Sequence, residues 1–269
     1  IKEYKLFYKS FKFTENLNNE AGLFHENLTF LVGFPRSGTT LLDSILRSHS
    51  KTYLIEELPY LINLRHNFFK KNSLKELSSM SLEKKIMLQK EYFNSFNYSK
   101  ERLIIDKFPL NLIELGFIKI LFPRSKIILA LRHPLDTILS CVLTSFKINE
   151  AMANFENLNT AAHFYNEVFN LYKVYENSFK INNYKIKYEN VVQKFEFEIE
   201  NLLNYLNLEF EDNVKNYYIT AKNREKIFTP SYNQVIKPLY QNSINRYLKF
   251  SETDKIKHLI NKWITEFGY

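Results

Sequence analysis

The sequence holds very little cysteine and no long apolar run. Cys141 is the only cysteine among the 269 residues, so an internal disulfide bond and a disulfide-stapled secreted scaffold are excluded. No apolar stretch approaches the roughly 20 residues that a membrane-spanning helix needs, and no signal peptide opens the chain. We therefore expect no membrane segment in this chain and a location in the cytoplasm.

Acidic residues are outnumbered, with 29 Asp and Glu against 37 Lys and Arg, which gives a formal net charge of +8. A solvated basic surface would explain this balance, and so would an anionic cofactor or acceptor. Nucleic acid would also fit the charge, but zinc-finger, RNA-recognition and helix-turn-helix signatures are missing from the sequence. We expect no nucleic-acid partner, whereas a dimer is compatible with the sequence.

What the sequence does contain is short apolar strands that alternate with helical patterns. This alternation predicts an α/β fold with a P-loop-type central parallel sheet of about five strands, helices on both faces and helical insertions. Strands are expected at residues 28–32, 52–55, 103–105, 126–131 and 184–188. Helices are expected at about 39–48, 59–71, 72–100, 134–146, 150–180, 193–206 and 251–267, with a less regular segment at 212–240.

The domain is expected to span residues 28–269, which with 45% hydrophobic residues suffice for one large core. Residues 1–27 form a polar and aromatic N-terminal extension. The chain begins with Ile1 rather than Met, so this extension is compatible with the end of a longer upstream region.

The most informative stretch follows the first strand and reads Gly33-Phe-Pro-Arg36-Ser37-Gly38-Thr39-Thr40. The amides of Ser37 to Thr40 and the following helix N-terminus would bind an anion, with Arg36 adding charge. The spacing nearly matches the P-loop of nucleotide triphosphatases, but Thr39 stands where that motif has its lysine. Because that lysine serves the β- and γ-phosphates, we expect a donor with fewer charges and no metal ion.

Further polar residues fall at or just beyond the ends of the expected strands. They are Glu57, Lys107, Arg132 and Tyr188. Ligands of parallel sheets bind at the carboxyl ends of the strands, so we expect these side chains to converge with the loop after Gly33 on one rim.

Arg132 is followed eight residues later by Ser140. Two turns of helix would bring Ser140 back to the side of Arg132, where the two could bind a phosphate. The alternative interpretation is an ordinary ion pair of Arg132 with Asp136 beside an unrelated helix hydroxyl. His133 receives no role.

Together these segments resemble the sulfotransferases that use 3′-phosphoadenosine 5′-phosphosulfate (PAPS). The likeness is greatest to the tyrosylprotein sulfotransferases and to the bacterial sulfotransferase domains attached to tetratricopeptide repeats. It runs from about Phe30 to Arg246 and rests on residues 34–42, 132–140, 186–192 and 231–238. Asn190 stands where an aspartate is common in the family.

The resemblance implies a role for each matching residue. Residues Arg36, Ser37, Gly38, Thr39 and Thr40 would hold the 5′-phosphosulfate, and Arg132 and Ser140 the 3′-phosphate. Tyr188, Ser231 and Arg246 would complete the cofactor site, and Lys237 lies in the same closing loop as Ser231. Arg36, Lys107 and Ser231 would stabilise charge during transfer, and Glu57 would be the general base. His49 and His66 are the competing bases.

The implied reaction moves a sulfonate from PAPS to an acceptor hydroxyl and releases adenosine 3′,5′-bisphosphate (PAP), with no metal. The acceptor could be a peptide tyrosine, a glycan or a small molecule, and the helical segments 60–100 and 150–180 are expected to line its side of the site. A P-loop kinase of small molecules is the alternative, which Thr39 disfavours. A non-catalytic nucleotide-binding domain is a third reading.

Overall fold

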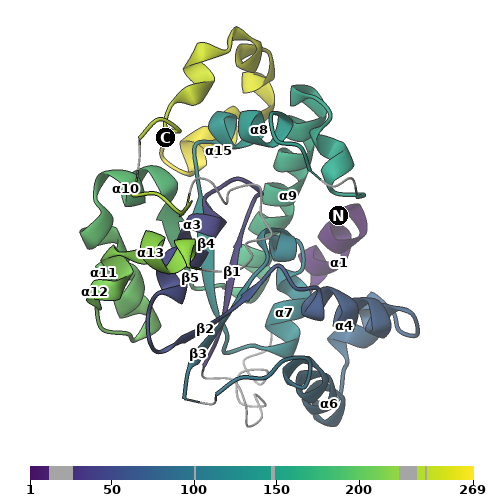
Figure 1. The fold of residues 1–269 in the computed structure, drawn as a ribbon. Helices are drawn as coiled ribbons and strands as arrows, with labels where there is room; N and C mark the ends of the chain where they lie inside the picture. Colours follow the sequence, from purple (N-terminus) through teal and green to yellow (C-terminus); the bar gives the residue numbers. More distant parts are fainter. Residues whose placement is uncertain (12–26, 100, 147–148, 224–234, 240) are drawn as a thin grey trace.

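Five parallel strands form a single sheet in the computed structural model, which describes residues 1–11, 27–99, 101–146, 149–223, 235–239 and 241–269 (Figure 1). The spatial order is β2-β3-β1-β4-β5, so β1 lies at the centre. The α/β class and the parallel sheet predicted from the sequence are confirmed. The strands are β1 (Leu28–Gly33), β2 (Thr52–Glu56), β3 (Leu103–Lys107), β4 (Lys126–Leu131) and β5 (Asn183–Lys187).

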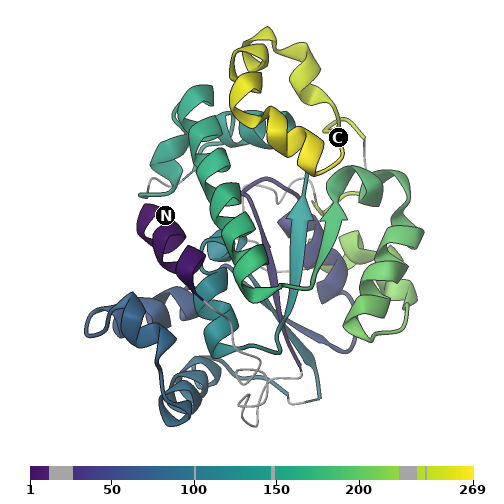
Figure 2. The same ribbon diagram turned by 180° about the vertical axis from the view of Figure 1, so that it is seen from behind.

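Helices cover both faces of this sheet, which explains why its inner strands are almost continuously apolar. Successive side chains of a strand point to opposite faces: Phe30 and Val32 join one core cluster, and Leu31 joins the other. The first cluster packs against α7 (Leu115–Leu121) and α9 (Leu158–Phe179), and Figure 2 shows α9 crossing this face. The second packs against α3 (Thr39–Arg47) and α11 (Phe195–Leu206).

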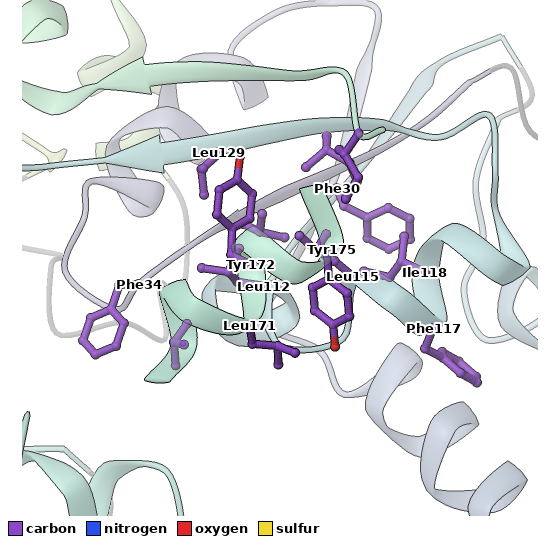
Figure 3. Packing of buried hydrophobic residues seen from close by; sticks show 14 of the residues in the cluster. Phe30, Phe34, Leu112, Leu115, Phe117, Ile118, Leu129, Leu171, Tyr172 and Tyr175 are labelled. Atoms are coloured by element: carbon purple, nitrogen blue, oxygen red, sulfur yellow. The ribbon is translucent and has the colours of Figure 1, made fainter. Parts of the chain in front are cut away.

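The larger core is rich in aromatic side chains. Figure 3 shows Phe30 and Leu129 of the sheet together with Tyr172 and Tyr175 of α9. A buried tyrosine hydroxyl usually finds a hydrogen-bond partner, and Tyr175 Oη donates to the carbonyl of Ile113 at 2.6 Å. Such a core does not tolerate truncation of its side chains, because replacing a buried phenylalanine by alanine typically lowers the free energy of unfolding by about 3–5 kcal/mol.

The expected helical insertion after β2 consists of three helices. They are α4 (Tyr60–Phe69), α5 (Leu74–Ser78) and α6 (Leu82–Phe93). A capping box starts α5: Ser73 Oγ accepts from the amide of Glu76 at 3.3 Å, and Glu76 Oε2 accepts from the amide of Ser73 at 2.6 Å. These paired bonds satisfy amides that a helix start otherwise leaves without partners.

The remaining elements complete the two sides of the sheet. They are α1 (Lys2–Ser10), η1 (Pro109–Leu112), α8 (Pro134–Val142), η2 (Met152–Phe155), α10 (Tyr188–Gln193), α12 (Asp212–Lys215), α13 (Tyr217–Lys222), η3 (Arg246–Lys249), η4 (Ser251–Ile256) and α15 (Lys257–Glu266). Within the described parts of the chain, no helix is both long and apolar enough to cross a bilayer.

Several boundaries differ from the sequence-based expectation, and three of them bear on the ends of elements near the site or the C-terminus. The expected last strand residue, Tyr188, is instead the first residue of α10. The helix expected to run to residue 146 ends at Val142, and the C-terminal helix begins as the 3₁₀ turn η4. Terminal residues are the least determined by local pattern, because the contacts that end an element come from other parts of the chain.

The N-terminal segment carries a helix that packs onto the domain. Tyr8 of α1 is buried, and its ring lies edge-on against Tyr175 of α9 with 5.0 Å between the ring centroids. Residues 2–10 therefore share the larger core with the rest of the chain.

Candidate functional site

The loop between β1 and α3 needs glycine at both of its ends. A Cβ atom at Gly33 would lie 2.6 Å from Ser37 Oγ and 2.7 Å from the carbonyl oxygen of Ala130. Gly38 has a φ of 99°, which side-chain-bearing residues rarely adopt, and a Cβ there would lie 3.0 Å from the Tyr188 ring. The two glycines thus let the loop turn tightly beneath Tyr188.

The loop also presents polar groups to its concave side. Arg36 has a φ of 71°, which is uncommon for a residue other than glycine, and its Nε donates to Ser140 Oγ at 3.0 Å. Ser37 Oγ is buried and has no hydrogen-bond partner within the described residues. The first amides of α3 have no acceptor inside the helix, so this corner suits a bound anion.

Glu57 stands beyond the end of β2, beside the loop. Its amide donates to the carbonyl of Lys107 at 2.8 Å, and Lys107 Nζ lies 2.7 Å from Glu57 Oε1 and 3.4 Å from Glu56 Oε1. The Lys107 side chain is fully buried, whereas one third of the Glu57 side chain is exposed. The buried lysine therefore contacts the Glu57 carboxylate but does not itself line the cavity.

Arg132 occupies the end of β4 and links three segments. Its Nη1 donates to the carbonyl of Arg36 at 3.3 Å, and its Nη2 donates to the carbonyl of Ser243 at 2.6 Å. The guanidinium lies over the Tyr188 ring, 5.1 Å from the centroid. Ser140 bonds Arg36 instead of Arg132, so the two arginines and the serine form one chain of contacts around the loop.

Asp136 fixes the segment that follows Ser243. Its Oδ1 accepts from the amide of Tyr247 at 2.7 Å, while its Oδ2 lies 4.0 Å from Arg132 Nη2. The ion pair considered in the sequence interpretation is thus present at its outer limit of distance, and it coexists with the loop contacts of Arg132. His133 stacks on Tyr247 at 4.3 Å; burial, and then the charge of Arg132, lower the pKa of His133 to about 4.

One cavity of about 890 Å³ joins these groups, near the upper end of the ~300–1,000 Å³ common for ligand sites. The part that we name the loop end is lined by Arg36, Gly38, Thr39, Thr40, Arg132, Tyr188 and Ser243. The part that we name the far end is lined by Glu57, Ile62, Arg65, Leu110, Ile113, Glu114, Phe146, Glu150 and Met152. The space is therefore large enough to hold two small molecules side by side.

Residues 29–212 match the model of the sulfotransferase family. The chain belongs to the sulfotransferase family. The matched range contains all five strands of the sheet, apart from the first residue of β1, and the loop after β1.

Solved structures share the sulfotransferase fold. The sulfotransferase domain of the olefin synthase from Synechococcus PCC 7002 superimposes with a TM-score of 0.56 and 17% identity, over 93% of this chain and 98% of that chain. The sulfotransferase domain from the curacin biosynthetic pathway gives 0.55 and 20%, over 89% and 98%. Mouse sulfotransferase SULT7A1, solved in complex with PAP, gives 0.53 and 15%, over 98% and 88%.

A longer relative occurs among curated sequences. An uncharacterized protein of Aquifex aeolicus (strain VF5) is 28% identical over 244 residues, which cover 83% of this chain and 30% of that protein. The sulfotransferase chain described here thus spans less than a third of the length of this relative.

Several residues predicted for the sulfotransferase site lie away from the cavity or cannot be placed. Arg246 is exposed, with its guanidinium 5.9 Å from the Phe250 ring, and does not line the cavity. Lys237 is exposed, although Val235 and Leu239 on either side line the cavity. Ser231 lies outside the described residues.

The competing histidine bases lie elsewhere in the sulfotransferase fold. His49 follows the C-terminus of α3, where its Nε2 is 2.9 Å from the carbonyl of Glu209. His66 is exposed on α4 and does not line the cavity. Neither histidine shares the cavity wall with the loop, whereas Glu57 does.

Sequence reasoning missed two features of the cavity. One is Ser243, whose carbonyl holds Arg132. The other is an ion pair at the far end, where Arg65 Nε lies 3.3 Å from Glu114 Oε1. No local pattern could have found these contacts, because the partners are separated by 111 and by about 50 positions in the chain.

Proposed function

We propose that this chain transfers the sulfonate group of PAPS to the hydroxyl group of an acceptor. The observation that carries the proposal is one cavity lined both by the loop residues Arg36 and Gly38 to Thr40 and by the carboxylate of Glu57. The PAP complex of a mouse sulfotransferase with the same fold supports this choice of donor.

The residues at the loop end fit a phosphosulfate donor. The amides at the start of α3 are donors for an anion. Ser37 Oγ, within the same loop, is buried without a partner among the described residues, although Ser37 does not itself line the cavity. Arg132 would bind the 3′-phosphate, with Tyr188 beneath its guanidinium, and Ser140 would act through Arg36. Thr39, in place of the P-loop lysine, suits a donor without a triphosphate or a metal ion. PAPS, when bound, supplies the activated sulfonate.

Glu57 would act as the general base. Its carboxylate accepts the acceptor proton while the acceptor oxygen forms its bond to sulfur and the bond from sulfur to the phosphate oxygen breaks. Lys107 holds the carboxylate in place through the 2.7 Å contact. Once Glu57 is protonated, the Lys107 ammonium can compensate charge that develops at the rim. Arg36 and Ser231 would stabilise the sulfonate oxygens, and Tyr188 would complete the donor site, whereas Arg246 lies away from the cavity.

The base assignment can be tested by replacing Glu57 with glutamine. We expect Glu57→Gln to lower kcat for transfer of labelled sulfonate from PAPS by about 10²–10⁴-fold, while the Kd for PAP, measured by calorimetry, stays within twofold. The control is Glu200→Gln, which changes an exposed carboxylate on α11. Unchanged transfer by Glu57→Gln would reject the base.

The donor assignment has its own test in the unmodified protein. We expect PAP to bind without added metal and more tightly than ATP with magnesium. Tighter binding of magnesium-ATP, or no binding of PAP together with no transfer to any hydroxyl in a mixed pool of phenols and alcohols, would overturn the proposed function.

A further inference from the structure

The far end of the cavity lies where an acceptor would meet Glu57. The helix α4, which supplies Ile62 and Arg65, follows the edge strand β2, whereas α10, which begins with Tyr188, follows the opposite edge strand β5 (Figure 1). The donor residues therefore occupy one side of the cavity and the far end the other. Whatever accepts the sulfonate must be accommodated by the residues of the far end.

The charge of the far end is opposite to that of the whole chain. The chain has a formal net charge of +8. Among the described residues that line the far end, however, the ionisable side chains are the carboxylates of Glu57, Glu114 and Glu150 and the guanidinium of Arg65. The surplus of basic residues therefore does not reach this part of the cavity wall, and the overall charge is a poor guide to the acceptor.

The guanidinium of Arg65 lies in a triangle of contacts with Glu114 and Tyr4, in which its Nε is within ion-pair distance of Glu114 but makes no hydrogen bond to a described residue. Arg65 Nε lies 3.3 Å from Glu114 Oε1, and Arg65 Nη1 donates to Tyr4 Oη at 3.3 Å. Tyr4 Oη in turn donates to Glu114 Oε2 at 3.3 Å. Because α1 is anchored by the buried Tyr8, Tyr4 is a fixed third member of this triangle.

The triangle is partly shielded from water, which strengthens its contacts. The side chain of Glu114 is 12% exposed and that of Arg65 is 29% exposed. Burial raises the pKa of Glu114, and the Arg65 charge opposes this rise. Burial together with the charge of Glu114 also raises the pKa of Tyr4 to about 12, so its hydroxyl remains a donor. An incoming anion would have to displace Glu114 from Arg65.

Most of the other far-end side chains are apolar, although the polar Asn111, Ser145 and Asn149 also line the cavity near them in the sequence. Ile62 of α4, Leu110 of η1, Ile113, Phe146 and Met152 of η2 contribute to its wall. Such a surface gains free energy from covering an apolar body, by about 25 cal/mol per Å² removed from water. These apolar side chains offer no hydrogen bond or charge to a carboxylate or sulfate group that leaves water.

We infer that Glu114 determines acceptor specificity: by holding Arg65, it makes the far end select apolar hydroxyl compounds that are neutral or cationic. Acidic peptides and anionic glycans are then poor acceptors, despite the basic chain. This inference rests on the proposed function in so far as it treats the bound compound as the sulfonate acceptor. The selection by charge is a property of the cavity, and binding measurements can test it without any transfer reaction.

The test uses three phenols of matched shape and different charge. They are 4-ethylphenol, which is neutral, tyramine, which is cationic, and 3-(4-hydroxyphenyl)propanoate, which is anionic. Affinity for the PAP-loaded protein is measured by ligand-observed NMR titration, and kcat/KM is measured with labelled PAPS. We expect the anion to be at least tenfold weaker than the neutral phenol in both measurements.

Two substitutions in the triangle should have different effects on the discrimination against the anionic phenol. Glu114→Gln leaves the Arg65 charge without its carboxylate, so the anion should gain at least tenfold relative to the neutral phenol. Arg65→Met removes the guanidinium, so discrimination against the anion should persist. The control is Glu167→Gln, which breaks the 2.9 Å ion pair between Lys5 of α1 and Glu167 of α9 outside the cavity wall and should leave the ratio unchanged.

The outcomes separate this inference from the proposed function. Equal or tighter binding of the anion by the unmodified protein overturns the inference, as does failure of all three phenols to bind, or a Glu114→Gln protein of native circular dichroism with an unchanged ratio. Absence of PAP binding and of sulfonate transfer overturns the proposed function instead. In that case the order of phenol affinities, measured on the unloaded protein, still decides the inference about charge.

Discussion

Asp106 is buried in the apolar core on β3, and replacing it with asparagine should change how stability depends on pH. The residue is completely buried, and Tyr92 Oη donates to its Oδ2 at 2.6 Å. Its Oδ1 has no hydrogen-bond partner in the described part of the chain. Burial raises the pKa of Asp106 from 3.8 to about 7, although the Tyr92 hydrogen bond and the Lys107 charge lower it again in part.

The sign of the effect follows from where the proton is held. Between pH 4 and pH 7 the folded protein keeps the proton on Asp106 and the unfolded chain has lost it. Stability must then fall as pH rises, by about 1.4 kcal/mol for each pH unit. From pH 5 to pH 7 the loss is roughly 2–3 kcal/mol, and it levels off above the folded pKa.

Asp106→Asn removes this titration and keeps an oxygen that can accept from Tyr92. Placing an amide N–H in the site of Oδ1 costs about 1–3 kcal/mol, at every pH. We expect the unfolding free energy of the variant, relative to that of the unmodified protein, to rise by about 2–3 kcal/mol between pH 5 and pH 8, whatever the constant offset between the two.

Urea unfolding followed by circular dichroism at pH 5, 6, 7 and 8 gives the required free energies. Only the difference in unfolding free energy between the two proteins is informative. The pKa of His133 is lowered to about 4, so this residue makes stability rise with pH up to its unfolded pKa. In the unmodified protein that rise partly cancels the fall caused by Asp106, and it is the same in the variant. Parallel curves for the two proteins would refute the reasoning. Tyr92→Phe removes the hydrogen bond that lowers the pKa of Asp106, so in this variant the fall in stability with rising pH should extend further above pH 7.

Three further substitutions test the site. Arg132→Lys loses the planar donors that reach two carbonyls and the stacking on Tyr188, so calorimetry should show PAP binding weakened by about 10–100-fold; a loss no greater than that of Arg124→Lys, on the surface, would contradict this. Gly38→Ala forces a side chain into a φ of 99° against Tyr188 and should lower the free energy of unfolding in urea by about 1–3 kcal/mol. An unchanged urea midpoint would show that the loop relaxes. Lys107→Met leaves two carboxylates without the buried ammonium and should cost about 3–5 kcal/mol of unfolding free energy. The exposed Lys75→Met serves as its control, and equal stability of the two variants would count against the buried contacts.

The strands and the loop were predictable because their signals are local. The expected strands agree with the observed ones to within a few residues, since apolar runs between turns report burial on both faces of a sheet. Of the rim residues expected from strand ends, Glu57, Arg132 and Tyr188 line the cavity, whereas Gly33 and Lys107 do not. The prediction for Tyr188 was wrong by one residue in the strand boundary, because Tyr188 is the first residue of a helix and not the last of a strand. It still lines the cavity.

The direction of side chains was less predictable than their place. Lys107 was expected to face the donor, yet its ammonium is buried between Glu56 and Glu57. Ser140 was expected beside Arg132, yet it accepts from Arg36. Position along a strand or helix sets which side of an element a residue occupies, whereas partners at hydrogen-bond distance depend on rotamers and on neighbouring elements.

The sequence by itself determined the class of fold, the position of the glycine-bounded loop after β1 and the family, because strand periodicity, two glycines and a missing lysine are all properties of short segments. Only the tertiary structure decided the far end of the cavity. Tyr4, Arg65 and Glu114 come from three distant segments and meet because α1 packs onto α9 and α4 lies beside the segment that precedes α7. Contacts of this kind are set by how helices pack on the sheet, and no local pattern of residues encodes them.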